Sequence, residues 1–156
     1  MVAISKSTLT SSIWKNFYDI MTSNVTTITL TDSSTQSVKT YTSSFPDSDI
    51  DSSSDYAILI VESPKLTTSN FTFTKDWIEG SIVINVFATK SEAADKFMDD
   101  ILDSIETNKD NLRALGLMMI ELEETDKDPF FRGDLKIHSE WARFRFKYTY
   151  THTQVY

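Results

Sequence analysis

The 156-residue chain contains no cysteine and only 3 glycines and 3 prolines. The absence of cysteine excludes disulfide bonds, thiolate metal ligands and cysteine nucleophiles. With so few glycines, the sequence has neither a P-loop nor a dinucleotide-binding turn, because both require closely spaced glycines. No run of about 18 apolar residues is present, so we expect no membrane-spanning helix. The N-terminal stretch lacks the apolar segment of a signal peptide, which predicts that the protein is made and kept in the cytoplasm.

Basic residues are also scarce. The chain has 23 Asp and Glu against 15 Lys and Arg, which gives a formal net charge of −8. Proteins that bind nucleic acid through its phosphates normally carry a net basic domain or a strong basic stripe. We therefore expect no specific nucleic-acid binding and no attraction to anionic membranes.

The residue patterns of common catalytic and metal sites are missing as well. Neither histidine lies in a known metal-ligand spacing, and no serine lies in a GxSxG turn. Asp47, Asp49 and Asp51 resemble the start of a calcium-binding loop. However, Ser52 stands where that loop needs glycine, and Ile58 stands where it needs a bidentate glutamate. We therefore expect no enzyme activity, no metal site and no cofactor.

The chain is rich in apolar residues, which can form a core. Apolar residues make up 40% of the sequence, with 10 Phe, 6 Tyr and 3 Trp, which suffices for one domain. Helical spacing predicts an amphipathic helix at 7–22 and a long helix that begins with a capping box of Thr89 and Glu92. A separate helical turn at 110–115 should end at Gly116. Alternating or β-branched runs predict strands at 25–30, 38–42, 56–61, 66–75, 80–88, 117–123 and 134–150.

The order of these elements predicts the fold class. Strands and helices do not alternate as they do in a doubly wound sheet. We predict a single α+β domain over 1–156, with an antiparallel or mixed sheet, an N-terminal helix and one long amphipathic helix packed on the sheet. The Ser/Asp-rich segment 43–55 is predicted to be a mobile loop, 125–134 a turn, and 151–156 a C-terminal tail.

The last predicted strand alternates basic and aromatic residues. Phe144 and Phe146 occupy even positions, whereas Arg143, Arg145 and Lys147 occupy odd positions. Because side chains of a strand alternate between its two faces, the rings should enter the core and the charges should face the other way. Base stacking would need the rings exposed beside the positive charge. The pattern therefore favours a structural strand over a nucleic-acid surface, and it leaves open a basic contact for a partner protein.

Three further features of this strand carry predictions. If 117–123 pairs antiparallel with it, Glu121 and Glu123 can lie opposite Arg143 and Arg145. Apolar residues stand at odd positions up to Trp141 and at even positions after it, which predicts a bulge or bend near 139–142. Fully extended, the strand would span about 50 Å, more than the roughly 40 Å width of a compact domain of this size. We therefore expect a bent hairpin, or one that projects and pairs with another subunit.

The turn DPFFRGD (128–134) contains the other candidate contact residues. Phe130, Phe131 and Arg132 lie between a proline and a glycine. The two rings can fold back onto the core. Alternatively they anchor another protein, since aromatic residues beside arginine are typical of interface hot spots.

The order of elements also resembles a known family. The chain has an amphipathic LTSSIWKNFYDIM (9–21), then YAILIVESPK (56–65) leading to GSIVINVFATKSEAADKFMDDILDSIE (80–106), and finally LMMIELEE (117–124) and WARFRFKYTY (141–150). As a pattern over most of the chain, this resembles the tail terminator (tail completion) proteins of long-tailed bacteriophages and related viruses.

The resemblance implies a structural protein of the virion, located in its tail or neck. Such a subunit assembles, typically sixfold, into a ring on the tail tube, ends tube polymerisation and offers a docking face to the neck or head. The implied partners are other copies of the chain, the tail tube protein and a neck or connector protein, with DNA passing through the ring. The alternatives are another head–tail connector or neck ring protein of the same virion, and a monomeric acidic adaptor for one partner protein.

A ring requires heterologous contacts, in which one surface of a subunit meets a different surface of the next. We expect an acidic helix face to meet a basic strand face and to set the register of the contact electrostatically. The candidate residues are Asp95, Asp99 and Asp103 on the helix, and Arg143, Arg145 and Lys147 on the strand.

Overall fold

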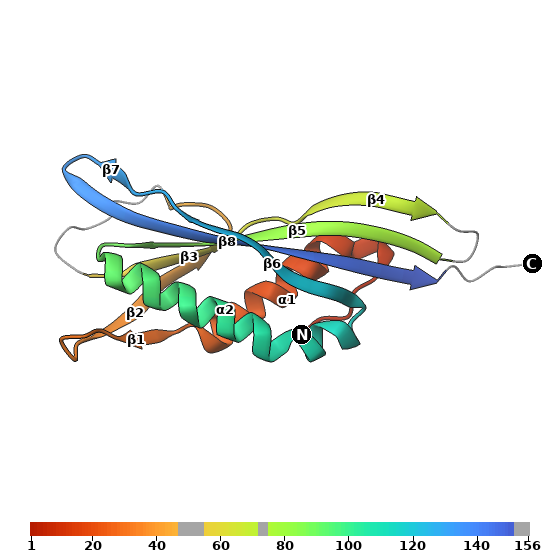
Figure 1. Ribbon diagram of the computed structural model, residues 1–156, viewed down its shortest axis with the longest axis horizontal. Helices are drawn as coiled ribbons and strands as arrows, with labels where there is room; N and C mark the ends of the chain where they lie inside the picture. The colour runs from red at the N-terminus through yellow and green to blue at the C-terminus, as the bar shows by residue number, and fades with distance from the viewer. Residues whose placement is uncertain (47–54, 72–74, 152–156) are drawn as a thin grey trace, which may run out of the picture.

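Two helices form where apolar residues recur at helical spacing, and both pack on the same face of a sheet (Figure 1). The computed structural model describes residues 1–46, 55–71 and 75–151. Helix α1 spans Leu9–Asn24 and follows a short 3-10 turn, η1 (Lys6–Thr8), and helix α2 spans Ser91–Ala114. None of the helices in these ranges has the length and apolar character needed to cross a membrane.

The sheet has eight strands within the described ranges. They are β1 (Thr27–Thr29), β2 (Thr35–Thr42), β3 (Ala57–Val61), β4 (Lys65–Phe71), β5 (Lys75–Ala88), β6 (Leu117–Lys127), β7 (Phe130–Arg132) and β8 (Leu135–Thr151). Their order is β1-β2-β3-β5-β8-β6, with β4 paired to β5 and β7 paired to β8. Only β2 and β3 are parallel; the other pairs are antiparallel. The predicted α+β domain with a mixed sheet, an N-terminal helix and one long packed helix is confirmed.

The long helix differs in two details from the sequence prediction. It runs without a break through 110–115, and Gly116 then leaves the helix with a φ of 97°. The capping box is wrong, because Glu92 does not cap its own helix. Its carboxylate accepts hydrogen bonds from the backbone and the hydroxyl of Thr31, at the end of the β1–β2 hairpin, while Thr89 bonds Asp55 at 3.3 Å.

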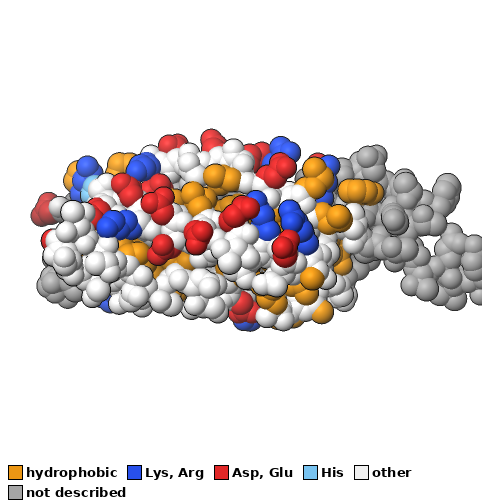
Figure 2. Space-filling model, turned by 60° about the horizontal axis from the view of Figure 1, so that its bottom comes forward, with side chains coloured by type: hydrophobic (Ala, Val, Ile, Leu, Met, Phe, Trp, Pro, Cys, Tyr) orange, Lys and Arg blue, Asp and Glu red, His pale blue; other side chains and the backbone are white. Residues whose placement is uncertain are grey.

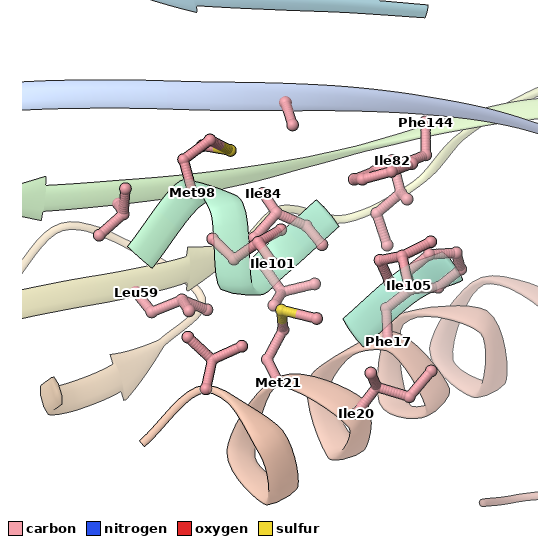
Figure 3. Packing of buried hydrophobic residues seen from close by; sticks show 14 of the residues in the cluster. Phe17, Ile20, Met21, Leu59, Ile82, Ile84, Met98, Ile101, Ile105 and Phe144 are labelled. Atoms are coloured by element: carbon pink, nitrogen blue, oxygen red, sulfur yellow. The ribbon is translucent and has the colours of Figure 1, made fainter. Parts of the chain in front are cut away.

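The main core lies between the helices and the sheet. Figure 3 shows Phe17 and Met21 of α1 and Ile101 of α2 directed toward Ile84 of β5 and Leu59 of β3. The even-numbered residues of β8 from 142 to 148 face this core and are nearly fully buried: Ala142 is 0% exposed, Phe144 3%, Phe146 1% and Tyr148 6%. The prediction that the rings of the last strand are buried is therefore confirmed.

A smaller apolar cluster lies on the opposite face of the sheet. It contains Tyr56, Ile58 and Ile60 of β3 and its approach, together with Phe45 and Phe87. This cluster explains the change of parity along β8, because odd positions near the start of β8 face the side on which Phe87 lies, whereas later even positions face the helices. The predicted bulge in β8 is wrong. Strands β5 and β8 pair without a register shift, from the pair of Lys75 and Thr151 to the pair of Ala88 and His138. The register shifts occur in β6 instead.

Strand β8 lies inside the sheet rather than at its edge. It pairs with β5 along one side and with β6 and β7 along the other, so it has no free edge between His138 and Tyr148. In this stretch it cannot add to the sheet of another subunit, contrary to the expectation of a strand that pairs outside its own domain. Its length fits because the molecule is elongated along β8, with the β7–β8 hairpin at one end and the ends of β4, β5 and β8 at the other (Figure 1).

The prediction of a turn at 125–134 is only partly correct. Strand β6 continues to Lys127, and β7 pairs with β8 immediately before a tight turn at Gly133, which has a φ of 61°. Most of the Ser/Asp-rich segment 43–55 and most of the tail 151–156 lie outside the described residues, as do Asp47, Asp49 and Asp51.

Candidate interaction surfaces

The face of the sheet that points away from the helices carries the basic residues of β8. Each of them has a carboxylate on a neighbouring strand: Arg143 with Glu124 at 2.9 Å, Arg145 with Glu123 at 3.6 Å, and Lys147 with Glu79 at 3.0 Å. The prediction that Glu121 and Glu123 lie across from the arginines is confirmed for Arg145, which lies opposite Glu121 in the register and forms its ion pair with Glu123. Arg143 lies opposite Glu124 instead, because two register shifts in β6 move the later acids along the strand.

Two tryptophans lie on this open face beside the cations. The guanidinium of Arg143 lies 5.2 Å from the ring of Trp141, and the ammonium of Lys147 lies 5.9 Å from the ring of Trp77. Aromatic rings beside cations can bind bases or a partner protein. Here the paired carboxylates balance the positive charge, so the surface lacks the excess positive charge that attracts phosphates.

The acidic residues of α2 fall into two groups. Asp95 is held by the ammonium of Lys127 at 2.6 Å, and this hydrogen bond keeps the pKa of Asp95 below its usual range. Asp99 and Asp103 are exposed, and no salt bridge joins either of them to a cation of the described chain. Of the three predicted helix acids, only these two are available to a partner.

The Asp95–Lys127 pair is part of a small charged cluster between α2, β6 and β8. Glu140 of β8 is 8% exposed, and its Oε2 atom accepts no hydrogen bond from the described residues, although Lys127 lies 3.7 Å away. Burial, followed by the neighbouring Asp95 carboxylate, raises the pKa of Glu140 above its ordinary value of 4.5.

We expect Glu140→Gln to change how the free energy of unfolding depends on pH. In the unfolded chain Glu140 ionises near its ordinary pKa, whereas the folded protein holds the proton to higher pH. The wild type therefore loses stability as pH rises above about 4.5, and the glutamine variant lacks this loss. Urea unfolding at pH 4 and pH 7 should show the variant gaining stability relative to wild type as pH rises. Exposed Glu121→Gln is the control, and parallel curves for Glu140→Gln would refute the expectation.

The β7–β8 hairpin separates the two phenylalanines of DPFFRGD. Phe130 folds back, with its ring centroid 5.9 Å from that of Phe45 and 6.0 Å from that of Phe87. Arg132 covers Phe45 at 5.6 Å and bonds the carbonyl oxygen of Pro46 at 3.3 Å. Phe131 points away and is 70% exposed. The prediction that the rings fold back is therefore confirmed for Phe130 and wrong for Phe131.

A recess of about 230 Å³ lies between the end of α1 and the middle of α2. It is lined by Asn24 of α1 and by Asp100, Asp103, Ser104, Thr107 and Asn108 of α2. Burial raises the pKa of Asp100, and the negative charges of Asp99 and Asp103 add to the effect. Helical periodicity alone places Asp100 on the solvated face of the helix, so the sequence does not distinguish it from the neighbouring acids.

A larger groove of about 550 Å³ runs beside the start of α1. Leu9, Trp14 and several serine and threonine residues line it, and none of the lining side chains among the described residues is titratable. Nothing in its lining could act as a general acid or base. Within the described ranges, no three His, Cys, Asp or Glu side chains lie close enough together to hold a metal ion.

Comparison of the sequence with models of known protein families and with curated proteins finds no match.

Proposed function

We propose that the protein is a structural component of a virus particle, a tail terminator whose copies form a ring, with six as the expected number. In this function the ring caps the tail tube, ends its polymerisation and provides the interface to the neck or head. The proposal rests on the resemblance in element order together with one structural observation. The unpaired acids of α2 and the basic residues of β8 lie on opposite sides of a single elongated subunit.

This placement suits a ring for a physical reason. A two-fold dimer uses the same patch twice, whereas a ring needs two different patches that complement each other. The helix layer and the open sheet face are two such patches, one acidic and one carrying arginines. Charge complementarity of this kind sets register and excludes wrong partners more than it adds affinity.

The ends of the subunit provide surfaces for other partners. The β7–β8 hairpin exposes Phe131 at one end, and the strand ends of β4, β5 and β8 form the other end (Figure 1). In the proposed ring these two ends would contact the tail tube protein and the neck or connector protein. DNA would pass through the ring without specific binding, since the cations on the sheet are already paired. The protein would be made in the host cytoplasm and reside in the virion.

The test is the mass of the assembly, measured by size-exclusion chromatography with light scattering and complemented by electron microscopy of negatively stained particles. We expect the wild type to form closed rings. Changing Arg143 and Arg145 together to Glu should leave the subunit folded but weaken the ring. Like charges facing each other across strands cost only about 0.2–1 kcal/mol per pair, less than the stability of a domain.

A charge-matched variant controls for this test. Changing Lys15 and Lys136 to Glu alters the net charge by the same amount at exposed sites on α1 and at the β7–β8 turn, away from the open face of the sheet and from α2, and its rings should persist. Rings of undiminished stability in the β8 variant would contradict the proposed contact.

The second candidate is a monomeric acidic adaptor, and the exposed ring of Phe131 favours it. Such a protein would hold one partner through an aromatic anchor. A monomer at every concentration, together with loss of partner binding in Phe131→Ala, would support this function instead.

A further inference from the structure

The recess between α1 and α2 presents oxygen acceptors almost exclusively. The amide nitrogen of Asn24 donates to the carbonyl oxygen of Ile20 at 2.8 Å, which leaves its Oδ1 atom free to accept. The side-chain nitrogen of Asn108 donates to the carbonyl oxygen of Ser104 at 2.9 Å, and its Oδ1 atom already accepts a hydrogen bond from Asn111 at 3.2 Å. With the carboxylates of Asp100 and Asp103, the lining therefore suits a ligand that carries several donors and a positive charge.

The carboxylates of this recess differ from the other acids of α2. Toward the ends of the helix the acids have cations: Glu92 with Lys96, Asp95 with Lys127, Glu106 with Lys109, and Asp110 with Arg113. In the middle, no salt bridge from a described residue reaches Asp99, Asp100 or Asp103. Figure 2 shows the side of the molecule that carries the helices, where acidic side chains are spread between apolar ones.

A second observation at the same place also points to a missing donor. Ser104 lines the recess and is only 8% exposed, yet its hydroxyl has no hydrogen-bond partner among the described residues. The Ser104 hydroxyl is not fully buried, so it opens into the recess and can accept a hydrogen bond there. A half-buried carboxylate next to like charges costs free energy, and one cationic donor group in the recess would relieve this cost and bond the hydroxyl as well.

We propose that the recess binds the guanidinium group of Arg145 from a second copy of the chain. This inference rests on the proposed ring and names the contact that joins neighbouring subunits. The recess lies on the helix layer and Arg145 lies on the opposite, open face of the sheet, so the contact is heterologous and propagates from copy to copy.

Arg145 is the most available of the three β8 cations. Its side chain is 60% exposed, compared with 36% for Arg143 and 30% for Lys147. Its ion pair is also the longest, at 3.6 Å to Glu123. A guanidinium carries five N–H donors in a planar fork, which matches a recess of carboxylate, amide and hydroxyl oxygens better than an ammonium does.

The test compares the strength of subunit association in neutralised variants. Changing Asp100 and Asp103 together to Asn keeps the side-chain shapes and removes the charges, so the fold is retained. Removing one side of a buried, hydrogen-bonded charge pair should weaken association by roughly 30-fold or more, measured by sedimentation or light scattering across a dilution series. Asp128→Asn with Asp134→Asn, two exposed acids of the hairpin region, is the matched control and should associate like wild type.

A charge swap separates the contact from general charge effects. Asp103→Arg alone and Arg145→Asp alone should each weaken association, and the two changes together should restore a large part of it. If the wild type forms rings and the Asn variant forms them with unchanged affinity, the inference is overturned while the proposed function stands. If the wild type remains monomeric at all concentrations, the proposed function and the contact both fail.

Discussion

Replacing Phe146 with alanine should remove a large part of the stability of the whole domain. Its side chain is 1% exposed, pairs with Gly80 across β5 and β8, and has its ring centroid 6.3 Å from that of Phe17 in α1. Truncation of such a residue leaves a cavity between sheet and helix, and comparable substitutions cost about 3–5 kcal/mol. Since domains are stable by only about 5–15 kcal/mol, we expect a marked fall in the midpoint of urea unfolding.

The control for Phe146→Ala is a residue one strand away on the open face. Glu121 is exposed and lies opposite Arg145 in the β6–β8 register, so Glu121→Ala should change stability by no more than about 0.5 kcal/mol. Equal effects of the two substitutions would mean that the rings of β8 are not in the core, and the assignment of its two faces would then fail.

Alternation along the last strand was predictable because the spacing of side chains on a strand is fixed by the backbone. One physical rule sufficed to place Phe144 and Phe146 in the core and Arg145 outside it. The change of parity after Trp141 was also visible in the sequence. Its cause was not, because the second apolar cluster is completed by Phe45 and Phe87, which come from distant parts of the chain. A bulge would explain such a change of parity from the strand alone. In this protein the explanation is tertiary, because a second apolar cluster lies on the other face of the sheet.

The partners of the charged residues were harder to predict than their faces. The sequence predicts Asp95 on an acidic helix face that meets another subunit, but β6 carries Lys127 to within 2.6 Å of it. Glu92 fitted a capping box and instead bonds Thr31, which is 61 residues away along the chain. Such pairings depend on how far each strand extends and where its register shifts, and local patterns do not contain that information.

The acidic recess between α1 and α2 was likewise not predictable from local sequence patterns. Periodicity groups Asp99, Asp100 and Asp103 on the outside of α2, whereas in the structure Asp100 and Asp103 line the recess. Asp100 lies in the recess because α1 ends beside it at Asn24. The packing of two helices thereby turns one acid of a uniform acidic face into a partly buried group that lacks a cation.

The close approach of Gly80 to Phe146 allows a second large effect to be tested. An added Cβ atom at Gly80 would lie 2.6 Å from the ring atoms Cε2 and Cζ of Phe146 and 2.8 Å from Leu66. The backbone φ of Gly80 is not positive, so alanine suffers no conformational strain there. We therefore expect Gly80→Ala to destabilise the protein by about 1–3 kcal/mol through steric overlap alone.

The destabilisation caused by Gly80→Ala should disappear when the ring of Phe146 is replaced by a smaller side chain. In a Phe146→Leu background the outer ring atoms are absent, and the half-buried end of Leu66 can move aside. Gly80→Ala should then change the free energy of unfolding by less than about 0.5 kcal/mol, and the double-mutant cycle should show a coupling of at least 1 kcal/mol between the two positions. If the effects of Gly80→Ala and Phe146→Leu were additive, the destabilisation by alanine would come from the backbone of β5. The close packing of β5 against β8 at Gly80 would then no longer explain why this strand contains a glycine.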